Sequence, residues 1–386
     1  MYPKWPTYSS SEIKKVKDIL TSGKVNYWTG DNCTNFENKF AKHFNKKFGI
    51  SLASGSIALD LAIKSLNLKK NDQVLVTPRS YIASASCVIS QNLIPIFVDI
   101  DLNSQNILYE DLKKKITKNT KAIILVHLAG YPCDMNKIVK ICKKYKIKII
   151  EDCSQAHGAK YNSKFVGSFG DIAIWSFCND KIMSTGGEGG MLLTNNYQYY
   201  KKIFALKDCG KNIDKIKKNN FKPKFQWIHD SIGNNFRMTE MQAAIGIIQL
   251  RNLNKWVKKR NSFSLKINKV LSNFSYIRTT KIPSNIFHSF YRCYFFLNKK
   301  IIENKFSRES IIKALKKSNI DCNVGSCPEI YLEGAFKKIK NVKRLKNAKI
   351  LGDTSVALFV NHNFNKIHET KYLNNLNKVL KKFDKK

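Results

Sequence analysis

The most informative stretch of this 386-residue sequence is Glu151-Asp152-Cys153-Ser154-Gln155-Ala156-His157-Gly158. It follows directly on an apolar run, residues 147–151, that predicts a buried β-strand. Ligands of open α/β sheets bind at the carboxyl ends of the strands. An aspartate held there is placed to pair with a cationic nitrogen of a bound ring, although an Asp at such a position is more often an N-cap or a turn residue. Asp152 is therefore a candidate that needs support from elsewhere in the chain.

Strand-like and helix-like segments alternate on both sides of this stretch. Strands are predicted at 74–76, 94–98, 122–128 and 147–151, and helices at 56–66, 82–91 and 135–145. This alternation predicts an α/β fold with a mostly parallel central sheet flanked by helices.

The last third of the chain differs from the first two thirds. Residues 238–258 predict a long helix, and from about Arg260 the chain continues as shorter helix and strand pieces. A chain of this length suits two domains. We expect a large domain over residues 1–255, with an N-terminal arm, and a smaller C-terminal α+β domain over residues 256–386.

The net charge of +40 is the one unusual bulk property. Such a charge attracts nucleic acid, anionic membranes or acidic substrates. Only 8 of the 68 basic residues are arginines, whereas bidentate recognition of bases and phosphates prefers the planar arginine fork. The lysines are spread over the whole length, which favours a solvated surface. A basic nucleic-acid-binding protein is the alternative from another class, and we expect no nucleic-acid partner.

Targeting segments and metal motifs are not evident. The first residues, MYPKWP, lack the basic start and apolar run of a secretory signal, and no apolar stretch approaches the ~20 residues of a membrane helix. We therefore expect a cytoplasmic protein without a membrane partner. The 10 cysteines form no Cys-x-x-Cys pairs, which favours reduced thiols and no metal site.

A second stretch, residues 176–190, holds a lysine in unusual surroundings. Lys181 follows the apolar residues 174–177 and precedes four glycines within five positions, which allow tight turns and the close approach of a ligand. In a lysine-rich chain any single lysine is expected at the surface. The apolar, sparsely charged neighbourhood of Lys181 instead predicts a partly desolvated amine with a lowered pKa. A lysine of this kind can form a Schiff base.

Taken together, these stretches resemble the DegT/DnrJ/EryC1/StrS family of sugar aminotransferases. That family belongs to the fold type I (aspartate-aminotransferase) enzymes that depend on pyridoxal 5'-phosphate (PLP). The resemblance runs from about Tyr8 to about His362 and includes, in the family order, residues 53–56, 78–83, 98–101, 127–130, 151–158, 176–190 and 235–244. It implies a PLP-dependent transferase fold of type I.

The resemblance also implies roles at the reacting end of the cofactor. Lys181 would form the Schiff base and shuttle the proton during transfer, and Asp152 would pair with the pyridine nitrogen. Gln155 would lie near the phenolic oxygen, and Tyr81 would stack on the ring face. From the residues alone Tyr81 would be read as a core aromatic, and His157 is either part of the site or a brace for Asp152.

At the phosphate end, the resemblance implies contacts from the backbone N–H groups of Gly55 and Ser56 and from the Ser176 hydroxyl. Without the resemblance, Gly55 would be read as a turn glycine and Ser176 as a strand-end hydroxyl. Asn235 would reach the phosphate bound by a neighbouring subunit, so the functional unit would be a homodimer with shared active sites.

The implied activity is ping-pong transfer of an amino group, with L-glutamate as the expected donor, to the keto-sugar of a nucleotide-linked (deoxy)hexose for aminosugar or surface-polysaccharide synthesis. A cyclitol or another keto acceptor is the alternative. A PLP-dependent sugar dehydratase is disfavoured because those relatives carry histidine where this chain has Lys181. Residues 325–331 and 355–362 resemble family segments on the substrate side, with substitutions, so the sequence leaves the acceptor open.

Overall fold

The central sheet of this computed structural model has seven strands. The structure describes residues 2–218, 227–303, 305–337 and 342–384. The strands are β1 (Phe48–Leu52), β2 (Gln73–Val76), β3 (Ile94–Phe97), β4 (Thr120–Val126), β5 (Lys148–Asp152), β8 (Ile172–Ser176) and β9 (Gly190–Thr194). They pair in the order β1-β9-β8-β5-β4-β2-β3, and all pairs are parallel except the two that involve β9. The predicted α/β fold with a mostly parallel sheet is confirmed.

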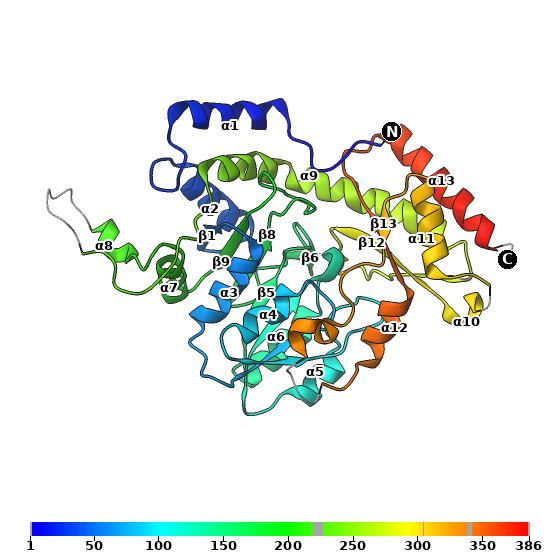
Figure 1. Cartoon of the computed structure of the whole chain (residues 1–386), viewed down its shortest axis with the longest axis horizontal. Helices are drawn as coiled ribbons and strands as arrows, with labels where there is room; N and C mark the ends of the chain where they lie inside the picture. Colours follow the sequence, from blue (N-terminus) through cyan, green and yellow to red (C-terminus); the bar gives the residue numbers. More distant parts are fainter. Residues whose placement is uncertain (1, 219–226, 304, 338–341, 385–386) are drawn as a thin grey trace.

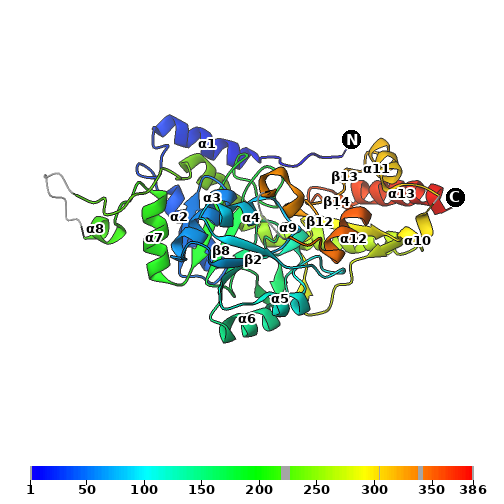
Figure 2. The same cartoon turned by 60° about the horizontal axis from the view of Figure 1, so that its bottom comes forward.

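Helices cover both faces of this sheet. The helices of this part of the chain are α1 (Ser10–Ser22), α2 (Asn32–His43), α3 (Gly55–Ser65), α4 (Ala83–Ile89), α5 (Tyr109–Lys115), α6 (Met135–Lys144), α7 (Tyr197–Lys207), α8 (Ile213–Lys217) and α9 (Glu240–Leu271). Alternate side chains of a strand point to opposite faces. Val74 and Val76 accordingly belong to the core that contains α3 and α4, and Leu75 to the core that contains α5 and α6. Figure 2 shows α3 and α4 on one side of β2 and α5 and α6 on the other.

Helix α9 is longer than predicted, since it continues past Lys258 to Leu271. Its first half buries Leu253 and Val257 in the core of the large sheet, and its second half buries Phe263 and Ile267 in a second core. The sequence around residue 259 is polar, but apolar residues resume at helical spacing and keep one face buried. The division predicted at residue 255 therefore falls inside a continuous helix.

The second core lies against a four-stranded antiparallel sheet, with the strand order β10-β12-β14-β13. Its elements are β10 (Ile277–Thr279), β12 (Arg292–Leu297), α10 (Lys299–Ile302), α11 (Arg308–Lys317), β13 (Cys322–Asn323), α12 (Lys346–Thr354), β14 (Ser355–Phe359) and α13 (Lys366–Asp384). A third, small sheet joins β11 (Ile286–Phe287) to β6 (Lys160–Tyr161) and β7 (Lys164–Phe165).

The N-terminal segment reaches this second part of the molecule. Tyr2 stacks on Phe364 with 5.1 Å between the ring centroids, and Figure 1 shows the N-terminus beside α13. Between these contacts and α1, Trp5 packs against Trp256 of α9 with 5.5 Å between the ring centroids. Within the described ranges, none of the helices is both long enough and apolar enough to cross a membrane.

Glu151 precedes Asp152 at the carboxyl end of strand β5 and is a fully buried carboxylate. It accepts backbone N–H groups from Gly167 (2.7 Å), Phe169 (2.8 Å) and Gly170 (2.6 Å), and it lies 3.1 Å from His127 Nε2. Burial raises the pKa of Glu151, but His127 and the backbone N–H groups outweigh it, so the pKa lies below its usual value. Glu151 thus fixes the loop after β7 to the strand that ends in Asp152.

We expect Glu151→Gln to lower the free energy of unfolding at pH 7 by about 3 kcal/mol, because the neutral amide loses charge-assisted hydrogen bonds and introduces donors facing buried donors. The folded pKa is depressed, so the stabilisation is present above the ordinary value of 4.5 and is lost as pH falls through the folded pKa. Urea unfolding should therefore show a smaller difference between the two proteins at pH 4 than at pH 7. Glu110→Gln, at an exposed pair with Lys113, is the control; a difference that does not depend on pH contradicts this account.

Candidate active site

The carboxyl ends of β5 and β8 and the start of α3 surround a cavity of about 550 Å³. Seven of the eight predicted site residues line it: Gly55, Ser56, Tyr81, Asp152, Gln155, Ser176 and Lys181. These residues come from four separate stretches of the sequence, and the parallel strand order brings them together, as expected for an open α/β sheet. Asn235 is not among the residues that line the cavity.

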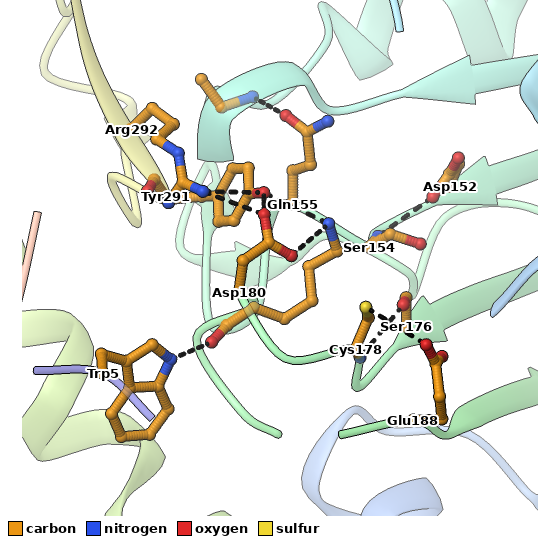
Figure 3. Close-up of polar contacts among 12 residues, drawn as sticks. Trp5, Asp152, Ser154, Gln155, Ser176, Cys178, Asp180, Glu188, Tyr291 and Arg292 are labelled. Atoms are coloured by element: carbon orange, nitrogen blue, oxygen red, sulfur yellow. Dashed lines mark hydrogen bonds and ion pairs between the residues drawn. The ribbon is translucent and has the colours of Figure 1, made fainter. Parts of the chain in front are cut away.

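Lys181 lies in the loop after β8, with its amine inside the cavity. The amine is 3.1 Å from Asp180 Oδ1 and donates to the Tyr291 hydroxyl at 3.2 Å. Its backbone is held from the other side, because the Trp5 indole donates a hydrogen bond to the Lys181 carbonyl at 2.7 Å (Figure 3). The N-terminal segment therefore helps to fix the loop that carries the amine.

The predicted lowering of the Lys181 pKa is wrong. Burial does lower the pKa of the amine, but Tyr291 and Asp180, by their charge and hydrogen bonds, outweigh the burial and raise it above its usual value. Asp180 stands next to Lys181 in the sequence, whereas Tyr291 comes from the second part of the chain, before β12. The sequence argument considered burial alone and left out these two partners.

Asp152 ends β5 with its carboxylate held in place. Oδ1 accepts the Ser154 backbone N–H at 3.0 Å, and Oδ2 accepts the Ser84 hydroxyl at 3.3 Å. The side chain thus makes the local turn contact and also lines the cavity. Gln155 is fixed as well, because its Oε1 accepts the backbone N–H of Ala129 at 2.8 Å.

The strand predicted at 122–128 ends two residues earlier than expected, just before a turn at Ala129. Strand β4 ends at Val126, and residues 128–130 form a single 3-10 turn in which Ala129 has φ 58°. This left-handed conformation is uncommon for alanine. The turn aims the Ala129 N–H at Gln155, so the early end of β4 serves the site.

His157 is fully buried against Phe177, with 5.8 Å between the ring centroids. Burial, with a smaller contribution from Lys181, lowers the pKa of His157 to about 3, so the ring is neutral at pH 7. No hydrogen bond joins it to Asp152 in the described part of the chain. His157 therefore packs beneath the site and does not brace the Asp152 carboxylate by a hydrogen bond.

One corner of the cavity is suited to an anion. Ser54 caps α3 by accepting the Ile57 N–H at 3.3 Å. The N–H groups of Gly55 and Ser56 have no intrahelical acceptors because they lie in the first turn of the helix. A Cβ on Gly55 would lie 2.6 Å from Ser176 Cβ. Only glycine therefore lets the start of α3 approach β8 closely enough for the helix N-terminus and the Ser176 hydroxyl to face one ligand.

Tyr81 lies on the open side of the cavity, where its side chain is 67% exposed, so it is not a core aromatic. It also lines an adjoining cavity of about 520 Å³. This second cavity is lined by residues from both parts of the chain, including Gln155, Lys181, Tyr291, Arg292, Tyr294, Asn323, Gly325, Ser326, Cys327, Glu333 and Phe359. The segments 325–331 and 355–362 thus contribute to it.

Asn235 is exposed, in a segment that is tied to the end of α7 through Asp208 and to β1 through the bridge between Leu52 and Arg237. The buried Asp208 pairs with Arg237 at 2.7 Å and Lys211 at 3.1 Å, and its backbone bridges to Asn235. The Oδ1 of Asn235 accepts the Arg237 backbone N–H at 3.4 Å, and the side chain is exposed outside its own cavity.

The sequence matches a known family over residues 6–374, described as the DegT/DnrJ/EryC1/StrS aminotransferase family. This chain belongs to the DegT/DnrJ/EryC1/StrS aminotransferase family. The aminotransferase from Psychrobacter cryohalolentis is 37% identical and superimposes with a TM-score of 0.96, covering 99% of this chain and 100% of that one. The GDP-perosamine synthase of Escherichia coli O157:H7 is 35% identical over 74% of this chain and 76% of that protein.

A relative with a different reaction shares the fold of this DegT/DnrJ/EryC1/StrS aminotransferase. The E. coli GDP-4-keto-6-deoxy-D-mannose-3-dehydratase, solved with bound hydrated PLP, is 25% identical, with a TM-score of 0.86 over 98% of this chain and 99% of that one. The fold class predicted from the sequence, fold type I, is confirmed by these structures.

The sequence reasoning missed several residues of this site. Asp180 precedes Lys181 in the stretch 176–190 and was assigned no role, although an acid next to a buried amine is itself a signal. Arg292 is one of only eight arginines, which is a weak indication. Tyr291, Ser84 and Trp5 carry no local signal, because only the tertiary structure brings them to Lys181 and Asp152.

We expect Asp180→Asn to lower the pKa of the Lys181 amine, because the variant loses the neighbouring negative charge. A lower pKa raises the reactive, unprotonated fraction of the amine at pH 8, so labelling of Lys181 should be several-fold faster. Acetylation of the cofactor-free protein at pH 8, followed by peptide mapping, measures this at Lys181. Asp230→Asn, which removes a surface partner of Lys215, is the control. Unchanged or slower labelling of Lys181 in Asp180→Asn would show that Asp180 does not set the charge of the amine.

Proposed function

We propose that this chain binds PLP through Lys181 and transfers an amino group from an amino acid, L-glutamate, to the keto carbon of a nucleotide-linked (deoxy)hexose. The observation that carries the proposal is the meeting of three groups in one cavity: the Lys181 amine, the Asp152 carboxylate and the N-terminus of α3. PLP needs an amine to hold it, an anion at its pyridine nitrogen and a receiver for its phosphate.

The residues present fit that cofactor. Asp152, fixed by Ser84 and Ser154, would keep the pyridine nitrogen protonated, and Gly55, Ser56 and Ser176 would receive the phosphate. When bound, PLP supplies an electron sink for the substrate carbon that loses a proton. Gln155, oriented by Ala129, would lie at the ring edge, and Tyr81 would cover the ring on the open side.

Lys181 would also move the proton. An amine released from the cofactor is a general acid and base, and its proton affinity depends on its neighbours. Asp180 and Tyr291 raise its pKa, so they favour uptake of a proton from the substrate carbon. The Trp5 hydrogen bond to the Lys181 carbonyl limits movement of the backbone while the side chain swings.

The second cavity supports a large acceptor. A sugar carried by a nucleotide needs space beyond the cofactor, and the adjoining cavity of about 520 Å³ provides it next to Lys181. The E. coli O157:H7 relative is named as a GDP-perosamine synthase, which favours a nucleotide-linked sugar over a cyclitol. A dehydratase reaction like that of the other E. coli relative is the second candidate, and a lysine at position 181 argues against it.

The test of this function uses borohydride reduction of the PLP-loaded protein, followed by peptide mapping. We expect the label on Lys181 and none in Lys181→Ala. With L-glutamate and keto-sugar nucleotides as substrates, Asp152→Asn should keep its fold but lose turnover on the order of a thousandfold, because the pyridine nitrogen loses its counter-ion. A label on another lysine, or full turnover in Asp152→Asn, contradicts the assignment of these residues.

We further propose a homodimer in which Asn235 of one subunit contacts the phosphate bound by the other, since Asn235 is exposed and lies outside its own cavity. Lys181→Ala and Asn235→Ala homodimers should both be impaired at low PLP concentration. A mixed dimer has one site with both residues intact, so mixing and refolding should restore activity. If mixtures with proven subunit exchange never exceed the average of the parents, Asn235 does not act across the interface.

A further inference from the structure

A single guanidinium, that of Arg292, projects into the second cavity beside the reactive amine. Arg292 begins β12, and its side chain is 9% exposed. The guanidinium lies over two aromatic rings, 4.0 Å from the Tyr291 centroid and 3.8 Å from the Phe359 centroid. Stacking of this kind fixes a planar guanidinium in one orientation and leaves its N–H edge for hydrogen bonds.

The N–H edge of Arg292 already holds one carboxylate. Nη2 donates to Asp180 Oδ2 at 2.9 Å and to the Tyr291 hydroxyl at 3.2 Å, and Nη1 donates to the Tyr291 carbonyl at 3.0 Å. A guanidinium has five N–H groups, so it keeps donors that have no acceptor within the described residues. Asp180 is 42% exposed and pairs with Lys181 through its other oxygen. Figure 3 shows Asp180 between Arg292 and the loop of the lysine.

Arg292 is one of two cationic side chains in these cavities. Among the described residues that line either cavity, Lys181 and Arg292 are the two with cationic side chains. With the N-terminus of α3 taken by the cofactor phosphate and the Lys181 nitrogen bonded to the cofactor, Arg292 would remain for an anionic group of a ligand. An oriented guanidinium recognises a carboxylate through two parallel hydrogen bonds.

We propose that Arg292 receives the α-carboxylate of the amino donor and that Asp180 occupies this receptor while the donor is absent. The proposal rests on the proposed transamination. The α-carboxylate carbon lies about 2.5 Å from the nitrogen that is transferred, as bond lengths require. A single carboxylate, that of Asp180, bridges Arg292 and the Lys181 amine. Arg292 is therefore near enough to the reacting nitrogen to receive the α-carboxylate. A nucleotide diphosphate is attached at the anomeric carbon, several bonds from the keto carbon, and is farther away.

A carboxylate on a sugar acceptor has the same chemistry, so the experiment separates the two sources. Glutarate, a dicarboxylate without an amino group, is titrated into the PLP-loaded protein at 0.15 M salt, and binding is followed by calorimetry and by the visible spectrum. We expect Arg292→Gln to raise the dissociation constant by about tenfold or more, since a charge-assisted bidentate contact is lost. Arg292→Lys keeps a cation in the site, so its dissociation constant for glutarate should lie between those of the wild type and Arg292→Gln.

Two further variants sharpen the binding test. Arg251→Gln removes the same charge from an exposed position of α9 and should leave binding unchanged, which controls for the strongly basic surface. Asp180→Asn removes the competing carboxylate and should tighten glutarate binding several-fold. Glutarate binding by Arg292→Gln that equals wild type, or weaker binding by Asp180→Asn, overturns the proposal. Equal labelling of Lys181 by PLP and borohydride in each variant shows that the site has folded.

The two half-reactions then identify the ligand. Conversion of the PLP form by L-glutamate should need a higher donor concentration in Arg292→Gln, whereas reaction of the amine form with keto-sugar nucleotide should not. A loss confined to the sugar half-reaction assigns the carboxylate to the acceptor and overturns the donor assignment. If wild-type protein aminates no keto-sugar but its glutarate binding depends on Arg292, the proposed acceptor fails while the carboxylate receptor stands.

Discussion

Two consecutive carboxylates at the end of β5 point to opposite faces of the sheet, and the site depends on this alternation. Glu151 is buried beneath the loop 167–170, and Asp152 lines the cavity beside Ser84. A shift of one residue in the register of β5 would exchange them. The four groups around Glu151 are paired by its two carboxylate oxygens. They therefore stabilise the register of β5 that keeps Asp152 in the cavity.

The second constraint is the meeting of two sheets at Lys181. The large sheet brings the amine through the loop after β8, and the antiparallel sheet brings Tyr291 and Arg292 through the start of β12. Helix α9 belongs to both cores and holds the two sheets at a fixed spacing. Buried Arg260 on this helix donates to the carbonyls of Phe290 and Tyr291 at 3.0 Å each. The pKa of Lys181 is therefore set in part by Tyr291, which is 110 residues away in the chain and whose backbone is held by α9.

How far the sequence could predict this arrangement depends on whether the cause is local. Strands β2 to β5 are runs of valine, isoleucine and leucine at the expected places, and Lys181 and Asp152 lie in recognisable stretches. The end of α9 was missed because the polar residues around 259 interrupt the apolar spacing, which resumes beyond them on the face that the second core buries. The pKa of Lys181 was predicted in the wrong direction for the same reason, since Tyr291 is 110 residues away in the chain.

The chain as a whole is strongly positive, whereas carboxylates outnumber cationic side chains among the described residues that line the two cavities. The described residues that line the two cavities include four carboxylates, Asp152, Asp180, Glu188 and Glu333, against the two cations Lys181 and Arg292. The excess of +40 is thus carried elsewhere, where salt screens it and where it acts on the encounter rate of anionic ligands. The oriented donors that these cavities offer to an anion are the N-terminus of α3 and the stacked guanidinium of Arg292. A surface lysine cannot replace either, because a mobile point charge attracts every anion to a similar degree.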